Sequence, residues 1–318
     1  MRDGLRGLAV LTLLAASQTA TDARELFVVC QDDATLVRVD TVRGDVTERL
    51  SLPQKPAMIA SAQEGRLLFV THPESGQISR VEVTTPPKVR GLAVGGAPFG
   101  VVASADGRRL YVGDWNANVV RKLDADTGAM LAEVAVGRGP TGLAMDLQER
   151  SLFVANRESR SITVIDLGSM RAKKTIEVGD GPFAITFDRG RERLYVANVR
   201  SGDITVVDAQ TETVLQTIAV GAAPYGLALD PSGSSLLVTS QHGDRVSIID
   251  VDTLHTLQAV GVGRYPEAVM VSGGRAYVAN WFSGDLSVLD LASARNIATI
   301  KLGEGPRSVA LGGESASQ

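Results

Sequence analysis

Residues that could perform metal or nucleophilic chemistry are few in this sequence. The chain has one cysteine, Cys30, and three histidines, His72, His242 and His255. Cys30, His72 and Asp114 are possible metal ligands by type, and they follow one another at 42-residue intervals. The sequence has no zinc-spaced histidine pair, paired-cysteine motif, phosphate-cradling glycine loop or nucleophile elbow. Metal or covalent catalysis therefore has little support.

Aromatic residues and arginines form a more informative set. Aromatic residues make up only 4% of the chain, yet both tryptophans occupy the same turn of a repeated unit and three other aromatic residues each follow a proline. Arginines and one glutamate fall in the same loops, a mixture typical of binding surfaces. The candidate ligand- or partner-binding residues are Trp115, Trp281, Phe99, Phe183, Tyr225, Arg138, Arg264, Arg307, Glu267 and His72. The alternative is that these side chains cover loops and fill gaps between repeats.

The elements that position these residues come from an internal repeat. Prolines recur in corners such as GRGP and GDGP, spaced by 42 residues except for a last interval of 40. They are Pro56, Pro98, Pro140, Pro182, Pro224, Pro266 and Pro306. Each period holds four short, β-branched runs bounded by Gly, Asp, Asn or Ser, which is typical of antiparallel strands. Four strands per period predict a propeller blade rather than the coil of a solenoid.

The two ends of the chain predict how the ring closes. The segment that begins ELFVVC supplies the second, third and fourth strands of a unit but no first strand, and GPRSVALGG near the C-terminus supplies a first strand alone. Six whole units and these two parts make seven blades. A blade shared by both termini leaves no sheet edge unpaired. We therefore predict an all-β, seven-bladed β-propeller of four-stranded blades over residues 24–318.

Two polar positions of the repeat have structural explanations. Aspartates end the third strand of most units, where their side chains can bond backbone N–H groups of the turn. The position that ends the second strand reads Cys30, His72, Asp114, Asn156, Asn198, Ser240 and Asn280. Asparagine, the commonest residue there, is expected to bond backbone groups of the turn or of a neighbouring blade. Second strands of neighbouring blades should lie about 10 Å apart, which favours packing over a shared metal ion.

The repeats resemble the YVTN family of β-propellers. The motif for which that family is named is seen as YVAN at Tyr195–Asn198 and Tyr277–Asn280, and as FVAN at 153–156. The resemblance covers essentially the whole chain after residue 23 and implies the propeller fold. It implies no single function, because such propellers serve as surface-layer proteins, binding modules, dehydrogenase subunits and a few enzymes.

The first 23 residues predict export. A basic start, MRDGLR, precedes a ten-residue apolar run and a small, polar segment, which is the layout of a cleaved secretory signal peptide and is too short to span a bilayer. We expect a periplasmic or secreted protein with no membrane insertion after cleavage. The single cysteine cannot form an intramolecular disulfide. The net charge of −4 argues against a nucleic-acid partner.

These observations predict an exported, non-catalytic binding or scaffold module without a cofactor. A protein partner or a small molecule would bind at the tryptophan-bearing face. The resemblance allows a role as an accessory or a subunit of a periplasmic, quinone-cofactor oxidation system. The alternative function is an enzyme of the propeller lactonase or lyase kind, with its site at the central mouth, where Glu267, Arg307, Arg264 and His72 could meet.

Overall fold

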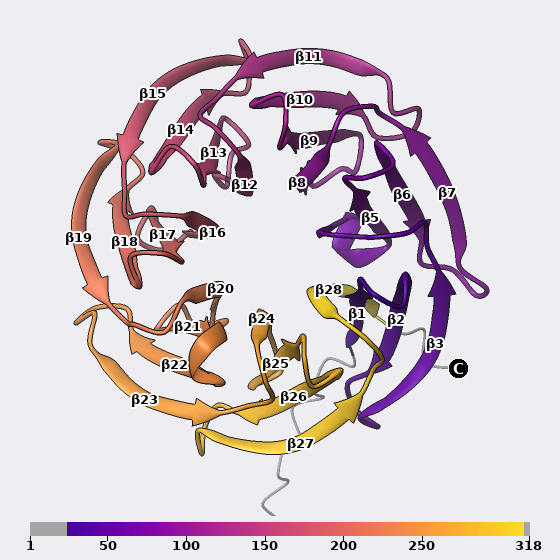
Figure 1. The fold of residues 1–318 in the computed structure, drawn as a ribbon, viewed down its shortest axis with the longest axis vertical. Coiled ribbons are helices and arrows are strands. Elements are labelled where there is room, and N and C mark those ends of the chain that lie inside the picture. The colour runs from indigo at the N-terminus through magenta and orange to yellow at the C-terminus, as the bar shows by residue number, and fades with distance from the viewer. Residues whose placement is uncertain (1–23, 315–318) are drawn as a thin grey trace, which may run out of the picture.

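The computed structural model describes residues 24–314, which form a ring of seven four-stranded antiparallel sheets. Figure 1 shows the sheets arranged around one axis, with the first strand of each blade nearest the axis and the fourth strand at the rim. The predicted all-β, seven-bladed propeller is confirmed. Helix in residues 24–314 is limited to two short 3-10 turns, η1 (Gln63–Gly65) and η2 (Gln241–Gly243).

The first four blades are described in chain order. Blade 1 contains β28 (Pro306–Glu314), β1 (Arg24–Cys30), β2 (Thr35–Asp40) and β3 (Asp45–Ser51). Blade 2 contains β4 (Ile59–Ala62), β5 (Leu67–His72), β6 (Gln77–Glu82) and β7 (Lys88–Ala93). Blade 3 contains β8 (Pro98–Ala103), β9 (Arg109–Asp114), β10 (Val119–Asp124) and β11 (Met130–Ala135). Blade 4 contains β12 (Pro140–Met145), β13 (Ser151–Asn156), β14 (Ser161–Asp166) and β15 (Arg171–Glu177).

The last three blades repeat the same order of strands. Blade 5 contains β16 (Pro182–Asp188), β17 (Arg193–Asn198), β18 (Asp203–Asp208) and β19 (Thr213–Ala219). Blade 6 contains β20 (Pro224–Leu229), β21 (Ser235–Ser240), β22 (Arg245–Asp250) and β23 (Thr256–Gly261). Blade 7 contains β24 (Pro266–Ser272), β25 (Arg275–Asn280), β26 (Asp285–Asp290) and β27 (Arg295–Lys301).

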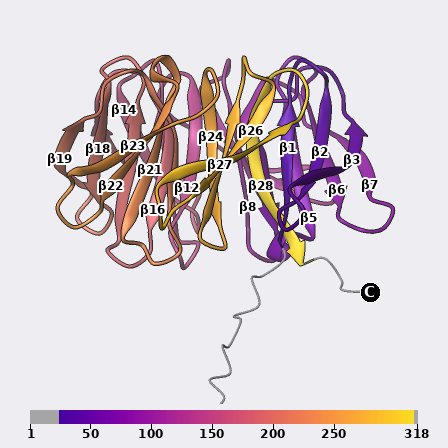
Figure 2. The same ribbon diagram turned by 90° about the horizontal axis from the view of Figure 1, so that it is seen from below.

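Blade 1 joins the two ends of the described chain. Strand β28 pairs antiparallel with β1, with Leu26 opposite Leu311 and Val28 opposite Val309, and Figure 2 shows the two strands side by side. The closure predicted from the termini is therefore confirmed. The predicted signal peptide, residues 1–23, lies outside the described residues. None of the helices within residues 24–314 has the length and hydropathy that a membrane crossing requires.

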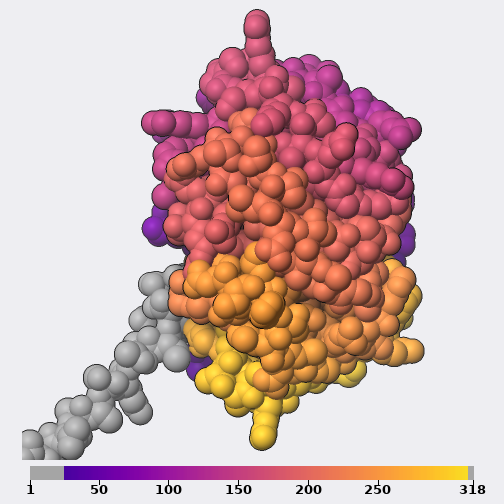
Figure 3. All heavy atoms as spheres, turned by 90° about the vertical axis from the view of Figure 1, so that its left-hand side faces the viewer, coloured from indigo at the N-terminus to yellow at the C-terminus, as the bar shows by residue number. Residues whose placement is uncertain are grey.

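The hydrophobic core lies between neighbouring blades. Tyr195 and Ala197 of β17, for example, share a buried cluster with Leu236 and Val238 of β21 in the next blade. Second strands are buried almost throughout, whereas the fourth strands are mostly exposed, as in β19. Figure 3 shows one side of the molecule as a closed surface, over which residues follow one another in chain order by colour. The apolar β-branched runs of the sequence thus bury their side chains between sheets.

The aspartates at the ends of the third strands cap the turns that follow. Asp250 Oδ1 accepts hydrogen bonds from the backbone N–H groups of Asp252 and Thr253, at 3.1 and 2.7 Å. The bond from Thr253 is the main cause that lowers the pKa of Asp250 below its usual value. Equivalent aspartate caps occur at Asp40, Asp124, Asp166, Asp208 and Asp290. The predicted structural role of these carboxylates is confirmed.

The first strands approach one another closely near their proline ends. A Cβ atom on Gly100 would lie 1.7 Å from the carbonyl oxygen of Thr141 in the next blade, and a Cβ atom on Gly226 would lie 2.2 Å from that of Glu267. Such contacts exclude any larger residue at these two positions without movement of the backbone. The glycines in PFG and PYG therefore allow the ring to narrow at this end.

Candidate functional site

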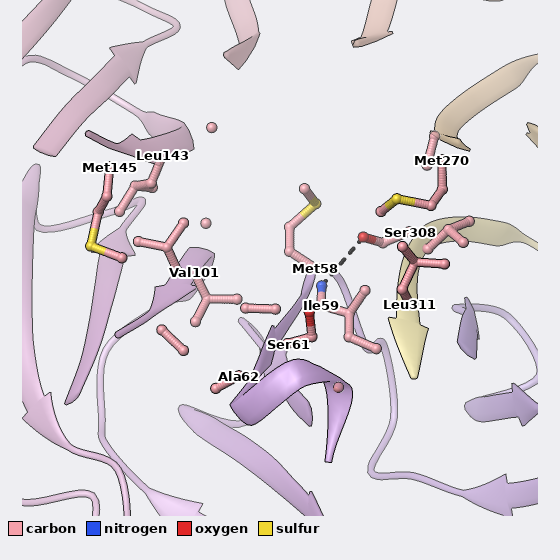
Figure 4. A pocket seen from close by; sticks show the side chains of 18 of the residues that line it. Met58, Ile59, Ser61, Ala62, Val101, Leu143, Met145, Met270, Ser308 and Leu311 are labelled. Atoms are coloured by element: carbon pink, nitrogen blue, oxygen red, sulfur yellow. Dashed lines mark hydrogen bonds between the residues drawn. The ribbon is translucent and has the colours of Figure 1, made fainter. Parts of the chain in front are cut away.

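The seven first strands surround a central channel with a volume of about 1730 Å³. Apolar side chains, among them Val101, Leu143, Met270 and Leu311, line part of its wall, and Figure 4 shows these side chains around a common space. One end of the channel lies at the proline corners, on the face that carries both tryptophans. The other end lies at the turns between first and second strands. The two ends differ in what fills them.

The residues directly after the corner prolines fill the tryptophan end. We call Phe99, Phe183, Tyr225, Glu267 and Arg307 the plug. The Phe183 and Tyr225 rings stack with centroids 3.9 Å apart, and Phe99 meets Phe183 edge-on at 6.0 Å. These contacts join blades that are not all neighbours, because Phe99 belongs to blade 3 and Phe183 to blade 5. The side chains therefore reach across the channel, and Phe183 and Tyr225 retain exposures of only 4% and 8%.

Arg307 connects the aromatic part of the plug to its polar part. Its guanidinium carbon lies 5.5 Å from the ring centroids of both Phe99 and Trp281, distances at which a cation is attracted to an aromatic face. The same guanidinium donates to Gln31 Oε1 at 3.1 Å and to the Tyr225 hydroxyl at 3.3 Å. Arg307 is thus held by residues from four different blades.

Glu267 is the buried acid of the plug. Glu267 is only 5% exposed. Its Oε2 lies 3.7 Å from Arg307 Nε, and its Oε1 accepts a hydrogen bond from Gln241 Nε2 at 3.1 Å. Burial raises the pKa of Glu267 to about 7, with Arg307 and Gln241 acting in the opposite direction. Oε2 and Arg307 Nε have no hydrogen-bond partner among residues 24–314. The pair is therefore a buried ion pair with incomplete hydrogen bonding.

The surface above the plug is aromatic. Trp115 packs on Phe99 with ring centroids 5.4 Å apart, and Trp281 covers Arg307. Beside them, Phe282 contacts Tyr265 at 4.8 Å. Phe282 is 61% exposed and is the one aromatic residue among the exposed large hydrophobic side chains of residues 24–314. We call Trp115, Trp281, Tyr265 and Phe282 the aromatic surface. Its two tryptophans rest on residues of the plug, whereas Tyr265 and Phe282 pack on one another.

In most blades the residue that ends the second strand ties its hairpin together. Asn198 Nδ2 donates to Asp203 Oδ1 and to Thr205 Oγ1, five and seven residues further on, and Asn280 makes the equivalent bonds to Asp285 and Ser287. These partners are side chains, so the expectation that asparagine bonds mainly to backbone groups was wrong. The side chain seven residues on faces the same way because the intervening turn brings it back along the third strand.

His72 and Asp114 make the same tie with different chemistry. His72 Nε2 shares a hydrogen bond of 2.9 Å with Ser79 Oγ, and Asp114 pairs with Arg121 at 2.9 Å, each partner lying seven residues on. Burial raises the pKa of Cys30, the first residue of this series, to about 12. Among residues 24–314 no group of three or more His, Cys, Asp or Glu side chains could hold a metal ion.

Comparison with models of protein families identifies the family of this propeller. The model of the YNCE-like beta-propeller family matches residues 22–189, which is more than half of the chain. The chain belongs to this family. The resemblance to YVTN-type propellers drawn from the repeats is confirmed. A search of curated proteins found no match.

Solved structures similar to this YNCE-like propeller have varied roles. The hydrazine synthase of Kuenenia stuttgartiensis shares 20% identity and covers 88% of this chain and 99% of its own, with a TM-score of 0.75. A functionally unknown protein from Desulfotomaculum acetoxidans DSM 771 shares 14% identity over 92% of this chain and 100% of its own, with a TM-score of 0.81. The dihydro-heme d1 dehydrogenase NirN shares 18% identity over 90% of this chain and 74% of its own, with a TM-score of 0.69. At these identities the likeness shows the fold alone.

Several predicted site residues of this YNCE-like propeller lie outside the plug. Arg138 and Arg264 are exposed on the rim of the tryptophan face, where they donate to the carbonyl oxygens of Glu158 and Phe282. His72 is fully buried and belongs to its hairpin tie. The other seven predicted residues, which are Phe99, Trp115, Phe183, Tyr225, Glu267, Trp281 and Arg307, form one connected cluster.

The sequence analysis missed two features. Tyr265 and Phe282 extend the aromatic surface, and their positions beside Pro266 and Trp281 in the sequence were the signal. The apolar channel walls were also missed. First strands such as PTGLAM and PYGLAL carry apolar or small residues at consecutive positions, whereas a strand with one wet face alternates with polar residues. That continuous run was the available signal for an apolar channel.

Proposed function

We propose that this protein is an exported, non-catalytic binding module that docks a protein partner through its tryptophan-bearing face. The observation that carries the proposal is the aromatic surface, in which Phe282 stays 61% exposed and packs on Tyr265, while Trp115 and Trp281 rest on residues of the plug. Exposed aromatic side chains cost free energy in water. Aromatic residues and arginines are the residue types that contribute most to protein–protein binding.

The plug gives the aromatic surface a fixed shape. Trp115 rests on Phe99, and Trp281 rests on Arg307, which is held in turn by Gln31 and Tyr225. Little side-chain freedom remains for a partner to remove on binding, and this lowers the entropic cost of association. The exposed Arg138 and Arg264 at the rim would add polar contacts around an apolar centre.

The partner that we propose is an enzyme of a periplasmic oxidation system. The YVTN resemblance includes propeller subunits of periplasmic quinone-cofactor amine dehydrogenases, and one similar solved structure is a dihydro-heme d1 dehydrogenase. The apolar run in residues 1–23 supports export. The net charge of −4 makes a nucleic-acid partner a poor fit.

Affinity purification from the native cell envelope tests this proposal. Tagged wild-type protein should retain one partner in stoichiometric amount. A variant with Phe282→Ala and Trp281→Ala should lose this partner. The control is Leu147→Ala, which should keep it, because Leu147 is an apolar residue of similar exposure in the turn between β12 and β13 on the opposite face. A solitary wild-type propeller, or equal retention by all three proteins, would contradict the docking role.

The second candidate function is a lactonase or lyase with its site at the plug. The observation that favours it is Glu267, whose raised pKa of about 7 suits a general acid or base at neutral pH. Arg307 and the Tyr225 hydroxyl lie beside it and could stabilise a developing oxyanion. A screen of lactone hydrolysis with wild-type protein and Glu267→Gln tests this function. Hydrolysis that the substitution abolishes would establish it.

A further inference from the structure

The wall of the channel exposes apolar side chains that a packed propeller would bury. Met58, Met145, Met270 and Leu311 belong to the innermost strands or their approach, yet each is only partly buried. Figure 4 shows them around the same space, with Met58 and Met270 near one another in the view. Apolar surface that borders a cavity loses contacts on one side and gains free energy when another apolar group fills the space.

The channel opens at one end only. The plug spans the tryptophan end, where Tyr225 and Glu267 are 8% and 5% exposed. At the opposite end the lining residues are charged and of both signs, including Glu64, Arg66 and Arg189. All three side chains are exposed. A ligand would therefore enter from the face without tryptophans.

Hydrogen bonds between neighbouring turns hold this opening in shape. Gln63 Nε2 donates to the Asp106 carbonyl at 2.9 Å, and the Ala105 N–H donates to Glu149 Oε1 at 2.7 Å. These two bonds join blades 2, 3 and 4 at the rim of the channel. The described ends of the chain, Arg24 and Glu314, are paired on the same face.

We propose that the channel binds a single-tailed amphiphile, with an apolar chain inside the channel and an uncharged polar head group at the opening. The charged residues that line the cavity among residues 24–314 are those of the plug, those of the turns at the open end, and the ion pair Glu25–Arg38, which favours an uncharged tail between the two ends. First strands of about six residues correspond to a length on the order of 20 Å. The volume of about 1730 Å³ exceeds that of ordinary small-molecule pockets.

Two further features define the ligand. Methionine side chains are flexible and polarisable, so three of them in one wall suit a chain of variable shape. The mixed charges of the opening attract neither anions nor cations strongly, so a neutral head group such as a sugar meets hydrogen-bonding partners of both kinds. This site is separate from the aromatic surface and does not depend on the proposed docking function.

Fluorescence titration with Nile red, a neutral apolar probe, tests the site. We expect one Nile red molecule per protein with blue-shifted emission, displaced by dodecyl maltoside below its micelle concentration. Met270→Glu places a carboxylate in the channel and should weaken binding about tenfold or more, because the ligand cannot solvate a buried charge. Leu257→Glu makes the same kind of change on the exposed strand β23 and should leave binding unchanged.

The possible outcomes separate the channel from other apolar surfaces. Equal weakening by Leu257→Glu, or no weakening by Met270→Glu, would overturn the proposal, as would binding that Phe282→Ala abolishes. If Met270→Glu does not fold, Ala184→Trp replaces it, because this substitution fills the channel with an apolar ring from the first strand of blade 5. A folded Ala184→Trp protein that binds Nile red as wild type would also contradict the site.

Discussion

The two ends of the channel are formed by opposite ends of the same first strands and differ in the side chains that they carry. At the tryptophan end, the residue after each corner proline is often large, and Phe99, Phe183, Tyr225 and Arg307 meet across the axis. At the opposite end, the corresponding turns carry charged side chains that point to solvent and leave the channel open. One variable position in a constant repeat is therefore enough to close one end.

This difference separates a rigid region from an accessible one. The plug combines ring contacts with a buried ion pair, so a change in any member disturbs the others. The walls of the open end contact few partners across the channel, so substitutions there should affect ligands more than folding. Repeat proteins divide structural and functional positions in this way, because residues that every unit needs for packing cannot also vary.

The largest expected effect is at the buried charge of the plug. Arg307→Ala leaves Glu267 without its ion-pair partner and removes the donors to Gln31 and Tyr225. We expect a loss of about 3–5 kcal/mol in the free energy of unfolding, measured by urea denaturation at pH 8. Arg264→Ala on the exposed rim is the control and should cost less than about 0.5 kcal/mol. Similar small losses in both variants would show that the plug is not a stabilising unit.

The pH dependence of stability sharpens the same comparison. Glu267 has a pKa of about 7 in the folded protein and about 4.3 when unfolded. Between these values the folded state binds more protons than the unfolded state, so stability falls as pH rises from about 4.5 to about 7. The difference between the two pKa values corresponds to about 4 kcal/mol.

Glu267→Gln removes this contribution. Relative to wild type, the variant should therefore gain up to about 4 kcal/mol between pH 4.5 and pH 8, because its side chain does not titrate. Urea denaturation of both proteins across this range measures the difference. A difference that does not change with pH would mean that Glu267 titrates normally.

The hairpin ties predict a smaller effect that is independent of the channel. Asn280→Ala removes two buried hydrogen bonds, to Asp285 and Ser287, and should cost about 1–3 kcal/mol. Ser240 occupies the same position in blade 6, but its hydroxyl has no hydrogen-bond partner among residues 24–314. Ser240→Ala should therefore be nearly neutral. Thermal unfolding of the two variants makes the comparison, and a reversed order would refute the tie.

The smallest expected effect is at His72. His72→Asn restores the commonest residue of this position and keeps a donor within reach of Ser79. The free energy of unfolding should change by less than about 1 kcal/mol, and any activity or partner binding should be retained. Loss of function in a stable His72→Asn protein would instead return His72 to the functional site.

The sequence predicted the fold because its signals are local and repeated. The proline spacing and the complementary segments at the two ends determine the blade number and the closing strand, and both are confirmed. The prediction that residues after the prolines gather on one face agrees with the cluster around Arg307. That Phe99 would reach Phe183 across the axis depends on the width of the ring, which no local pattern contains.

The remaining features depend on distances between blades. Met58, Met145 and Met270 are far apart in sequence and share a wall only because the ring closes. The seven-residue tie of Asn198 to Thr205 depends on the register of one hairpin, and its side-chain partners were mistaken for backbone groups. The raised pKa of Glu267 follows from its burial in the closed ring, which the attraction of Arg307 in another blade only partly offsets.

Site-specific photo-crosslinking in cells tests the docking face most directly. A photoreactive phenylalanine analogue at position 282 keeps the aromatic character of Phe282, and the same analogue at position 147 samples the opposite face. We predict a single crosslinked protein of defined size from position 282 and none from position 147. A crosslink from position 147 alone, or none from either position, would contradict a partner docked on the aromatic surface.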